Sequence, residues 1–145
     1  MARLTSGRAR CVKLALDTNA YKALGEGNQQ LAEEARTADA VGLPMIVLGE
    51  LWFGFMSGTK LRQNAATLER FLATPRVRVL NPDYQTPRVF GEIATLLRQT
   101  GVAIQQNDIW ISALCKQHGF VLATRDRGFQ HVLGLEVIEF STNPG

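Results

Sequence analysis

Residues 11–24 read "CVKLALDTNAYKAL" and contain the signal that decides the fold. The first six, Cys11–Leu16, form a short apolar run with polar residues on both sides, which is typical of a buried strand. Asp17, Thr18 and Asn19 follow at once, and all three residue types commonly cap the start of a helix. A buried strand that turns directly into a helix indicates the first half of a β-α-β unit.

The same alternation recurs along the rest of the chain. We expect four more strands, at "AVGLPMIV", "VRVL", "FVLAT" and "LEVIEF", and a turn or short helix at "RDRGFQHV". Helical spacing of apolar residues predicts the segments between them. We expect one helix from "DTNAYKAL" through "QQLAEEARTA" to near Asp39, a second through Glu50 to about Met56, and a third at "KLRQNAATLERFL". A fourth should run from about Asp83 to Thr100 and end at Gly101. A fifth is expected at "NDIWISALCKQH", with Asn107 as its cap candidate and Gly119 at its end.

Strands that alternate with helices predict an α/β fold with a parallel sheet and helices on both faces. The 145 residues, of which 46% are hydrophobic and 20% charged, fit a single globular domain, because neither a linker nor a repeat interrupts them. We expect flexible tails at about residues 1–10 and 141–145.

Composition also narrows the class of protein. The chain has no apolar run of roughly 18–20 residues, and the apolar segment near its start is too short for a signal peptide, so we expect a cytoplasmic protein. Cys11 and Cys115 lie in apolar segments without metal-ligand spacing, which favours free buried thiols. A net charge of +3 and a pI near 9.2 hint at a polyanionic partner.

Four acidic residues fall where a doubly wound sheet binds its ligands, beyond the carboxyl ends of the strands. Asp17 follows the first strand and Asp126 follows "FVLAT", whereas Asp108 opens a helix that is apolar on almost every side. Glu50 interrupts the apolar run "MIVLGELWFGF", residues 45–55. Clustered carboxylates repel one another, and a hard cation such as Mg²⁺ relieves that repulsion. An all-carboxylate Mg²⁺ or Mn²⁺ site suits metal-assisted phosphodiester hydrolysis.

Simpler interpretations exist for each acid. Asp17 could be only a helix cap, Asp108 only a partner of the helix dipole, Asp126 only a turn residue, and Glu50 a residue on the wet side of its helix. None of these explains why all four fall on one edge. Other chemistries fit less well: the sequence lacks phosphate-binding glycine and GxSxG motifs. His118 and His131, both near ends of elements, are expected at the surface.

These residues resemble a known family. The segments "LALDTNA", "VLGELWFG", "GVAIQQNDIWISALCKQHG" and "LATRDRGFQHVLGLEVI" occur in the order and at the separations seen in PIN domains, specifically VapC-type toxin ribonucleases. The resemblance covers residues 13 to 138. It carries the family's acidic residues onto Asp17, Glu50, Asp108 and Asp126 as catalytic metal ligands, and supporting polar positions onto Thr18, Asn19 and Thr124.

The resemblance implies a three-layer α/β/α PIN-like domain with a mainly parallel sheet, spanning residues 1–145. It also implies a homodimer, Mg²⁺ or Mn²⁺ as cofactor, an RNA substrate, and a cognate antitoxin that masks the site. Two departures stand out. Gln105 replaces a frequent proline, which affects loop rigidity, and "IVLG" lacks the hydroxyl residue that often precedes the glutamate, which removes support for the site.

Three alternatives to a toxin endoribonuclease stay open: a housekeeping PIN nuclease in RNA processing, a catalytically idle RNA- or protein-binding module, and, as the weakest fit, a phosphoryl-transfer domain.

Setting the four site acids aside leaves nine acidic residues against 16 basic ones, so the remaining surface carries an excess of positive charge. The candidates for contacts with the RNA backbone are Arg62, Arg98, Arg125 and Arg127. Trp52, Phe53 and Phe55 cannot all face one side of a helix, so at least one is expected to border an antitoxin groove beside Glu50.

Overall fold

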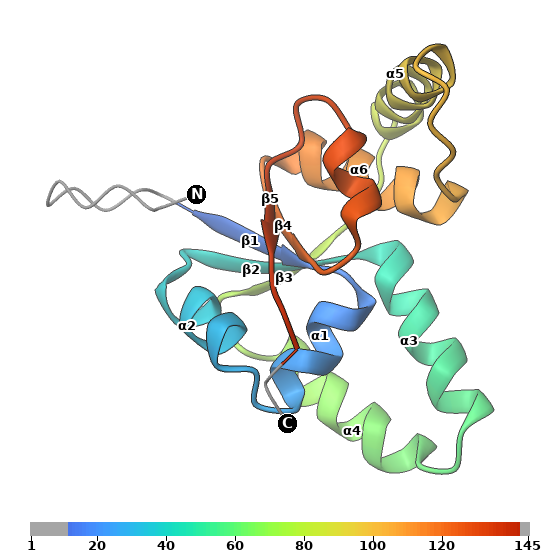
Figure 1. Ribbon diagram of the computed structural model, residues 1–145. Coiled ribbons are helices and arrows are strands. Elements are labelled where there is room, and N and C mark those ends of the chain that lie inside the picture. Colours follow the sequence, from blue (N-terminus) through green and yellow to red (C-terminus); the bar gives the residue numbers. More distant parts are fainter. Residues whose placement is uncertain (1–11, 143–145) are drawn as a thin grey trace, which may run out of the picture.

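A five-stranded sheet lies at the centre of the computed structural model, which describes residues 12–142 (Figure 1). Its strand order is β3-β2-β1-β4-β5, and every neighbouring pair is parallel. The expected parallel α/β class is therefore confirmed. The strands are β1 (Lys13–Leu16), β2 (Ala40–Pro44), β3 (Val77–Leu80), β4 (Val121–Thr124) and β5 (Val137–Glu139).

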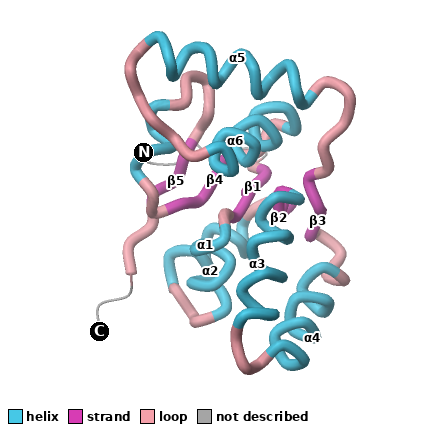
Figure 2. Tube along the Cα trace, turned by 90° about the vertical axis from the view of Figure 1, so that its right-hand side faces the viewer, coloured by secondary structure: helices cyan, strands magenta, loops and turns pink. Residues whose placement is uncertain are grey.

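Helices cover both faces of the sheet, which confirms the three-layer architecture. Helices α1 to α4 lie on one side, and α6 lies on the other with α5 outside it (Figures 1 and 2). The helices are α1 (Thr18–Gly25), α2 (Gln29–Thr37), α3 (Met45–Ser57), α4 (Leu61–Leu72), α5 (Thr86–Gln99) and α6 (Gln106–His118), and a 3₁₀ helix, η1, covers Arg127–His131.

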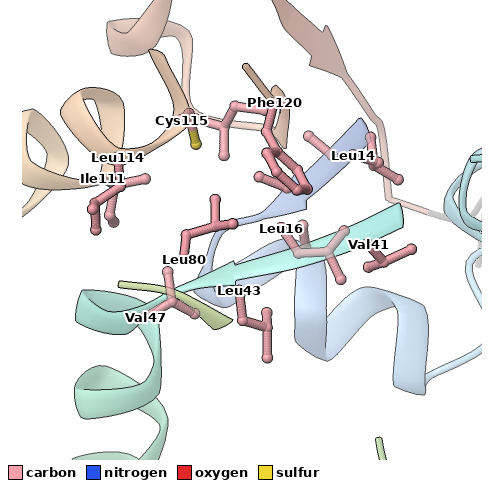
Figure 3. Close-up of a cluster of buried hydrophobic side chains, with 14 of the residues drawn as sticks. Leu14, Leu16, Val41, Leu43, Val47, Leu80, Ile111, Leu114, Cys115 and Phe120 are labelled. Atoms are coloured by element: carbon pink, nitrogen blue, oxygen red, sulfur yellow. The ribbon is translucent and has the colours of Figure 1, made fainter. Parts of the chain in front are cut away.

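The main core lies where side chains of the sheet meet those of the helices (Figure 3). Leu14 and Leu16 of β1 and Leu122 of β4 are fully buried, as expected of strands covered on both faces. Helix α6 contributes Ile111, Leu114 and Cys115 from above, as its apolar sequence predicts. Helix α5 does not belong to this core, because its Ile93 and Leu97 pack with α6 in a second, smaller cluster.

The connection between β1 and β2 differs from the prediction of one continuous helix. Helix α1 ends at Gly25, and α2 begins after Asn28. Gly27 adopts a left-handed φ of 90°, which ends the first helix, and the Asn28 side chain accepts a hydrogen bond from Leu31 N–H at 3.0 Å and so caps the second. The turn between the two helices is therefore encoded locally.

Element ends account for the other differences. The strand expected to run through residues 40–47 stops at Pro44, which pairs with the last residue of β3 and so has no further strand to follow. Helix α5 starts at Thr86 instead of Asp83, because the Thr86 hydroxyl accepts from Asp83 N–H before the helix begins. The predicted helix ends at Gly101 and Gly119 are confirmed, and both glycines have positive φ.

The predicted terminal features lie largely outside the described residues. Cys11 and the tail at residues 1–10 belong to the part that is not described, as do residues 143–145. Ser141, expected in the C-terminal tail, accepts a hydrogen bond from Asn28 at 2.9 Å through its carbonyl. Cys115 is a free, buried thiol, as predicted, and burial raises its pKa. None of the described helices is long and apolar enough to span a membrane.

Candidate metal centre

The strand order changes direction at β1, since β2 and β3 lie on one side of it and β4 and β5 on the other. Ligands in doubly wound sheets bind outside the carboxyl ends of the strands at such a switch point. Asp17 directly follows β1 there, and its backbone N–H is 3.4 Å from the carbonyl of Ala123 in β4. The first acid thus sits where the topology favours a site.

Asp17 is both a helix cap and a buried acid. Its Oδ1 accepts a hydrogen bond from Ala20 N–H at 2.8 Å at the start of α1, so the simpler interpretation as a cap is correct. Yet only 7% of the residue is exposed. Burial raises the pKa of Asp17, hydrogen bonds to Thr124 and Ala20 oppose that shift, and the charges of Asp126 and Glu50 add to it. Capping and electrostatic coupling to two other acids coexist in one residue.

Asp126 is positioned by a turn at the end of β4. Its side chain accepts from Gly128 N–H at 2.8 Å at the start of η1, and its backbone N–H donates to the hydroxyl of Thr124 at 3.0 Å. Thr124 is fully buried and also serves Asp17 as a hydrogen-bond partner. One hydroxyl therefore links the two acids that follow β1 and β4.

Glu50 does not simply point into water. It lies half-buried on α3, where Thr18 Oγ1 donates to Glu50 Oε1 at 2.5 Å and Asn107 Nδ2 donates to Oε2 at 3.3 Å. Helices α1 and α6 thus hold the Glu50 carboxylate from two sides. Of the polar residues singled out by the resemblance, Thr18 contacts Glu50, whereas Asn19 is exposed on the first turn of α1.

Asp108 lies on the first turn of α6, three residues after Gln105, which begins the helix without a side-chain cap. Asn107 is consequently not the cap that the sequence suggested, because the helix starts two residues earlier. The pKa of Asp108 is raised to about 6 by burial first and then by the charges of Asp126, Glu50 and Asp17. This acid is therefore electrostatically coupled to all three others.

Uncompensated negative charge characterises the site. Within residues 12–142, none of the four acids forms a salt bridge with Lys or Arg. Carboxylates that raise one another's pKa are stabilised by a bound cation, and an all-oxygen set of this kind matches Mg²⁺ or Mn²⁺. In the same residues, however, no three Asp, Glu, His or Cys side chains form a ready-made metal site. The donor chemistry fits a hard divalent ion, which in proteins usually keeps several of its waters and takes only one or two carboxylates directly.

The two histidines lie at element ends, as predicted. His118 ends α6, at the opposite end of that helix from Asp108, and its Nε2 is 3.0 Å from the carbonyl oxygen of Asn81. His131 is exposed at the end of η1. Neither contributes to the shifted pKa of Asp17 or Asp108. The carboxylates are thus the titratable groups that characterise this edge of the sheet.

A groove of about 380 Å³ lies between α1, α3 and α4. None of the four acids lines it, but Tyr21 follows Asp17 by four residues and Gly54 follows Glu50 by four, so the groove begins about one helical turn beyond these two acids. Its floor includes apolar side chains. The lining residues are Tyr21, Lys22, Gly25, Glu26, Leu51, Gly54, Phe55, Asn64 and Thr67.

The three aromatic residues after Glu50 point in different directions, as expected. Phe55 lines the groove and is largely buried. Trp52 is half-buried and packs edge-to-face on Phe55, with ring centroids 5.7 Å apart. Phe53 is 75% exposed and is not among the groove residues. Phe55 is therefore the groove aromatic, and Tyr21 joins it from α1.

The arginines proposed to contact RNA are all exposed, but they differ in position. Arg125 and Arg127 flank Asp126 directly. Arg98 lies in the last turn of α5, ahead of the loop that leads to α6, and Arg62 lies in the first turn of α4. Arg125 and Arg127 are the strongest of these candidates, because they are the ones adjacent to an acid of the site.

Sequence reasoning missed the contribution of Asn107, which it treated only as a cap candidate. It also missed the glycines and Tyr21 of the groove. The sequence contains a hint of each contribution, because Asn107 directly precedes Asp108 and Gly54 lies one helical turn after Glu50. What the sequence does not contain is the approach of α6 to α3, which brings Asn107 to Glu50.

The geometry agrees with comparisons with known proteins. The model of the PIN domain family matches residues 14–135. The chain belongs to the PIN-domain family. Ribonuclease VapC2 of Haemophilus influenzae is 30% identical over 129 residues, which cover 86% of this chain and 95% of that relative.

Solved structures give the same answer for the fold. The VapBC-1 structure from nontypeable Haemophilus influenzae matches with a TM-score of 0.78 and 26% identity, over 88% of this chain and 98% of the matched one. The VapBC2 structure from Rickettsia felis, bound to a DNA fragment from the promoter, matches with a TM-score of 0.80 and 23% identity, over 90% and 100%. The Haemophilus structure agrees with the VapC-type resemblance found in the sequence. The Rickettsia structure supports the fold.

Proposed function

We propose that this chain is a divalent-metal-dependent endoribonuclease, a single PIN-type nuclease domain that hydrolyses RNA phosphodiester bonds. The observation that carries the proposal is the group of four carboxylates at the switch point of the sheet: Asp17 and Asp108 have raised pKa values, and within residues 12–142 none of the four pairs with Lys or Arg. Similarity to proteins named VapC ribonucleases supports it. An RNA substrate also fits the cytoplasmic location expected from the sequence.

Asp17, Glu50, Asp108 and Asp126 would hold Mg²⁺ or Mn²⁺. When bound, the ion lowers the pKa of a water nucleophile and stabilises charge on the phosphate. The protein's part is to orient the acids: Thr124 lies between Asp17 and Asp126, and Thr18 holds Glu50. Asn19, exposed beside Thr18, is proposed to support the site from the solvent side.

The direct test is cleavage of single-stranded and structured RNA by the purified protein, in EDTA and with added Mg²⁺ or Mn²⁺. We expect cleavage only with metal, and its loss in Asp108→Asn, which keeps the shape of the side chain and removes its charge. Metal-independent cleavage, or an Asp108→Asn protein as active as wild type, would contradict the proposal.

We further propose that the nuclease is the toxin of a type II toxin–antitoxin pair. Its structural neighbours include VapBC complexes described as toxin–antitoxin systems, which favours this role over a housekeeping nuclease. A small DNA-binding protein encoded immediately upstream would support the toxin role. The intact set of four acids argues against a catalytically idle binding module.

The antitoxin segment is proposed to lie in the groove between α1, α3 and α4. Apolar Leu51 and Phe55 line the groove, and Asp17 and Glu50 lie one helical turn before its residues Tyr21 and Gly54. A segment with a large apolar side chain would fill the groove, and a basic residue would reach the carboxylates and compete with the metal. Such a partner should inhibit cleavage, and excess Mg²⁺ should partly restore it.

Gly54 offers a sharp test of this groove. A Cβ at Gly54 would meet nothing within 4 Å, and Gly54 lines the groove, so Gly54→Leu should extend a side chain into it. Replacing glycine inside a helix also favours folding, by up to about 1 kcal/mol. We expect Gly54→Leu to keep RNA cleavage but to bind the antitoxin at least about 10-fold more weakly, a difference of about 1.4 kcal/mol.

Gly91→Leu is the matched control, since Gly91 is also an open position inside a helix but lies on α5, away from the groove. Equal antitoxin affinity for the two variants and wild type would rule out the groove.

A homodimer is the remaining part of the proposal. Helix α3 exposes Met45, Phe53 and Met56 on one side, with the open position Gly49 between them. Apolar residues exposed along one helix are typical of an interface, and the homodimer that the family resemblance implies would bury them against a second copy. Phe53→Glu should shift the protein toward monomer in sedimentation, whereas Tyr84→Glu, at an even more exposed aromatic far from α3 in sequence, should not. Identical sedimentation of Phe53→Glu and wild type would exclude this interface.

A further inference from the structure

Asn107 is a neutral residue that contacts one of the four acids, Glu50. Its Nδ2 donates to Glu50 Oε2 at 3.3 Å, while Thr18 Oγ1 donates to Oε1 of the same carboxylate at 2.5 Å. Each oxygen of Glu50 therefore has one donor, and the two donors come from different helices. Thr18 directly follows Asp17, and Asn107 directly precedes Asp108.

This arrangement fixes Glu50 relative to two other acids. Glu50 extends from α3 on a flexible side chain, and repulsion from Asp17 and Asp108 favours conformations that turn it away from them. Hydrogen bonds to Thr18 and Asn107 oppose that movement. Because both donors are neutral, they hold the carboxylate without cancelling the charge that attracts a cation. A lysine in the place of Asn107 would neutralise Glu50 instead.

A role at the start of α6 does not account for Asn107. The helix begins after Gln105, so Asn107 is its second residue and not its cap. The side chain is exposed, and burial does not explain the contact either. Across residues 12–142, the Asn107 side chain has no hydrogen bond other than the one to Glu50.

We infer that Asn107 is a positioning residue of the metal centre, which orients Glu50 for metal binding through its side-chain amide. The inference rests on the proposed metal-dependent nuclease. Asn107 then acts through Glu50 and has no contact with the reacting phosphate. Neutral hydrogen-bond partners of metal ligands commonly change metal affinity by about 10- to 100-fold when they are removed.

The test compares three variants with wild type in Mn²⁺ titrations followed by electron paramagnetic resonance, and in RNA cleavage at increasing Mg²⁺. Asn107→Ala removes the donor, and Asn107→Gln keeps an amide. Gln106→Ala is the matched control, because Gln106 is its exposed neighbour in the same helical turn.

We expect Asn107→Ala to bind Mn²⁺ about 10-fold more weakly. Its kcat should fall with little change in KM for RNA, and high Mg²⁺ should recover much of the rate. Asn107→Gln should restore a large part of both properties, and Gln106→Ala should match wild type. Melting temperatures in EDTA should be similar for all four proteins, since the changed side chains are exposed.

Two results overturn the inference in distinguishable ways. If wild type binds Mn²⁺ and cleaves RNA but Asn107→Ala does both equally well, Asn107 has no positioning role, and the proposed function stands. If wild type itself neither binds Mn²⁺ nor cleaves RNA, the proposed function fails and this inference fails with it.

Discussion

The backbone N–H of Asp126 donates a hydrogen bond to the hydroxyl of Thr124 at 3.0 Å, and that hydroxyl is also a hydrogen-bond partner of Asp17. Thr124 ends β4 and is fully buried. A side chain without charge therefore connects the acids that follow the two central strands, β1 and β4. The geometry of the candidate site depends on this residue as much as on the acids themselves.

Thr124→Val should lower both stability and cleavage. Valine matches the shape of threonine, but the Asp126 N–H and the buried Asp17 carboxylate would each lose a partner, which should destabilise the fold by about 1–3 kcal/mol. Urea unfolding measures the first effect and RNA cleavage the second. Thr124→Ser retains the hydroxyl and should recover much of both. A Thr124→Val protein with wild-type cleavage would show that the hydroxyl is dispensable.

Substitutions at Asp17 should separate its two roles. Asparagine caps helices about as well as aspartate, so Asp17→Asn should keep the cap of α1 and lose cleavage, because the charge is gone. Asp17→Ala should lose cleavage and also the cap, which is worth about 1 kcal/mol. Metal should raise the melting temperature of wild type more than that of either variant, since ligand binding stabilises the native state. Equal cleavage by wild type and Asp17→Asn would refute the assignment of Asp17 to the metal.

The raised pKa of Asp108 predicts how stability depends on pH in EDTA. Between its ordinary value near 3.8 and about 6, the folded state holds the Asp108 proton more tightly than the unfolded chain does. The contribution of Asp108 to the free energy of unfolding therefore falls as the pH rises from about 3.8 to about 6, and ionised Asp108 destabilises the fold above that range. Asp108→Asn removes the ionisable group, so its melting temperature should exceed that of wild type at about pH 7.5 and approach it near pH 4.

Bound metal should oppose this difference in melting temperature between Asp108→Asn and wild type. With Mg²⁺ present at about pH 7.5, wild type gains binding energy that the variant lacks, so the difference in melting temperature should shrink or change sign. Protons and metal compete for the Asp108 carboxylate, so cleavage at limiting Mg²⁺ should decline as the pH falls, and added Mg²⁺ should restore it. A variant that is less stable than wild type in EDTA at neutral pH would contradict the repulsion inferred for this site.

The sequence predicts most of the fold because its signals are local. Lys13–Leu16 followed by Asp17 specifies a strand and a capped helix within a few residues, and Gly101 and Gly119 end helices through their own backbone conformation. Placing acids after parallel strands then follows from topology, which is why Asp17 and Asp126 could be expected at one edge.

Contacts between distant segments explain what the sequence could not predict. Asn107 and Glu50 are 57 residues apart, and only the packing of α6 beside α3 brings them together. The break at Gly27 and Asn28 is different, because its signals are local and a continuous helical pattern obscured them. The orientation of Trp52 and Phe53 depends on which face of α3 meets the core, which periodicity does not determine in a helix that is apolar all round.

Gly42 tests the packing of the sheet independently of the site. A Cβ added there would lie 2.8 Å from the Phe120 ring and 3.1 Å from Leu80, both of which are buried. Gly42→Ala should therefore destabilise the protein by about 1–3 kcal/mol through overpacking. Gly91→Ala, at an open position inside α5, should stabilise it by up to about 1 kcal/mol. Chemical denaturation of both variants gives the comparison, and a neutral Gly42→Ala would mean that Phe120 moves freely.

RNA binding should depend on salt and on the arginines beside Asp126. Each phosphate contact releases counterions, so binding measured in EDTA with the Asp108→Asn protein should weaken as salt rises. Arg127→Ala should lower the slope of log affinity against log salt by about 0.7, the value for one contact with a single strand. Arg36→Ala is the control, because Arg36 is exposed on α2 and pairs with Glu33 at 2.6 Å. If Arg127→Ala and Arg36→Ala have the same slope as the parent protein, Arg127 does not contact the RNA backbone, and Arg125 and Arg98 become the positions to change next.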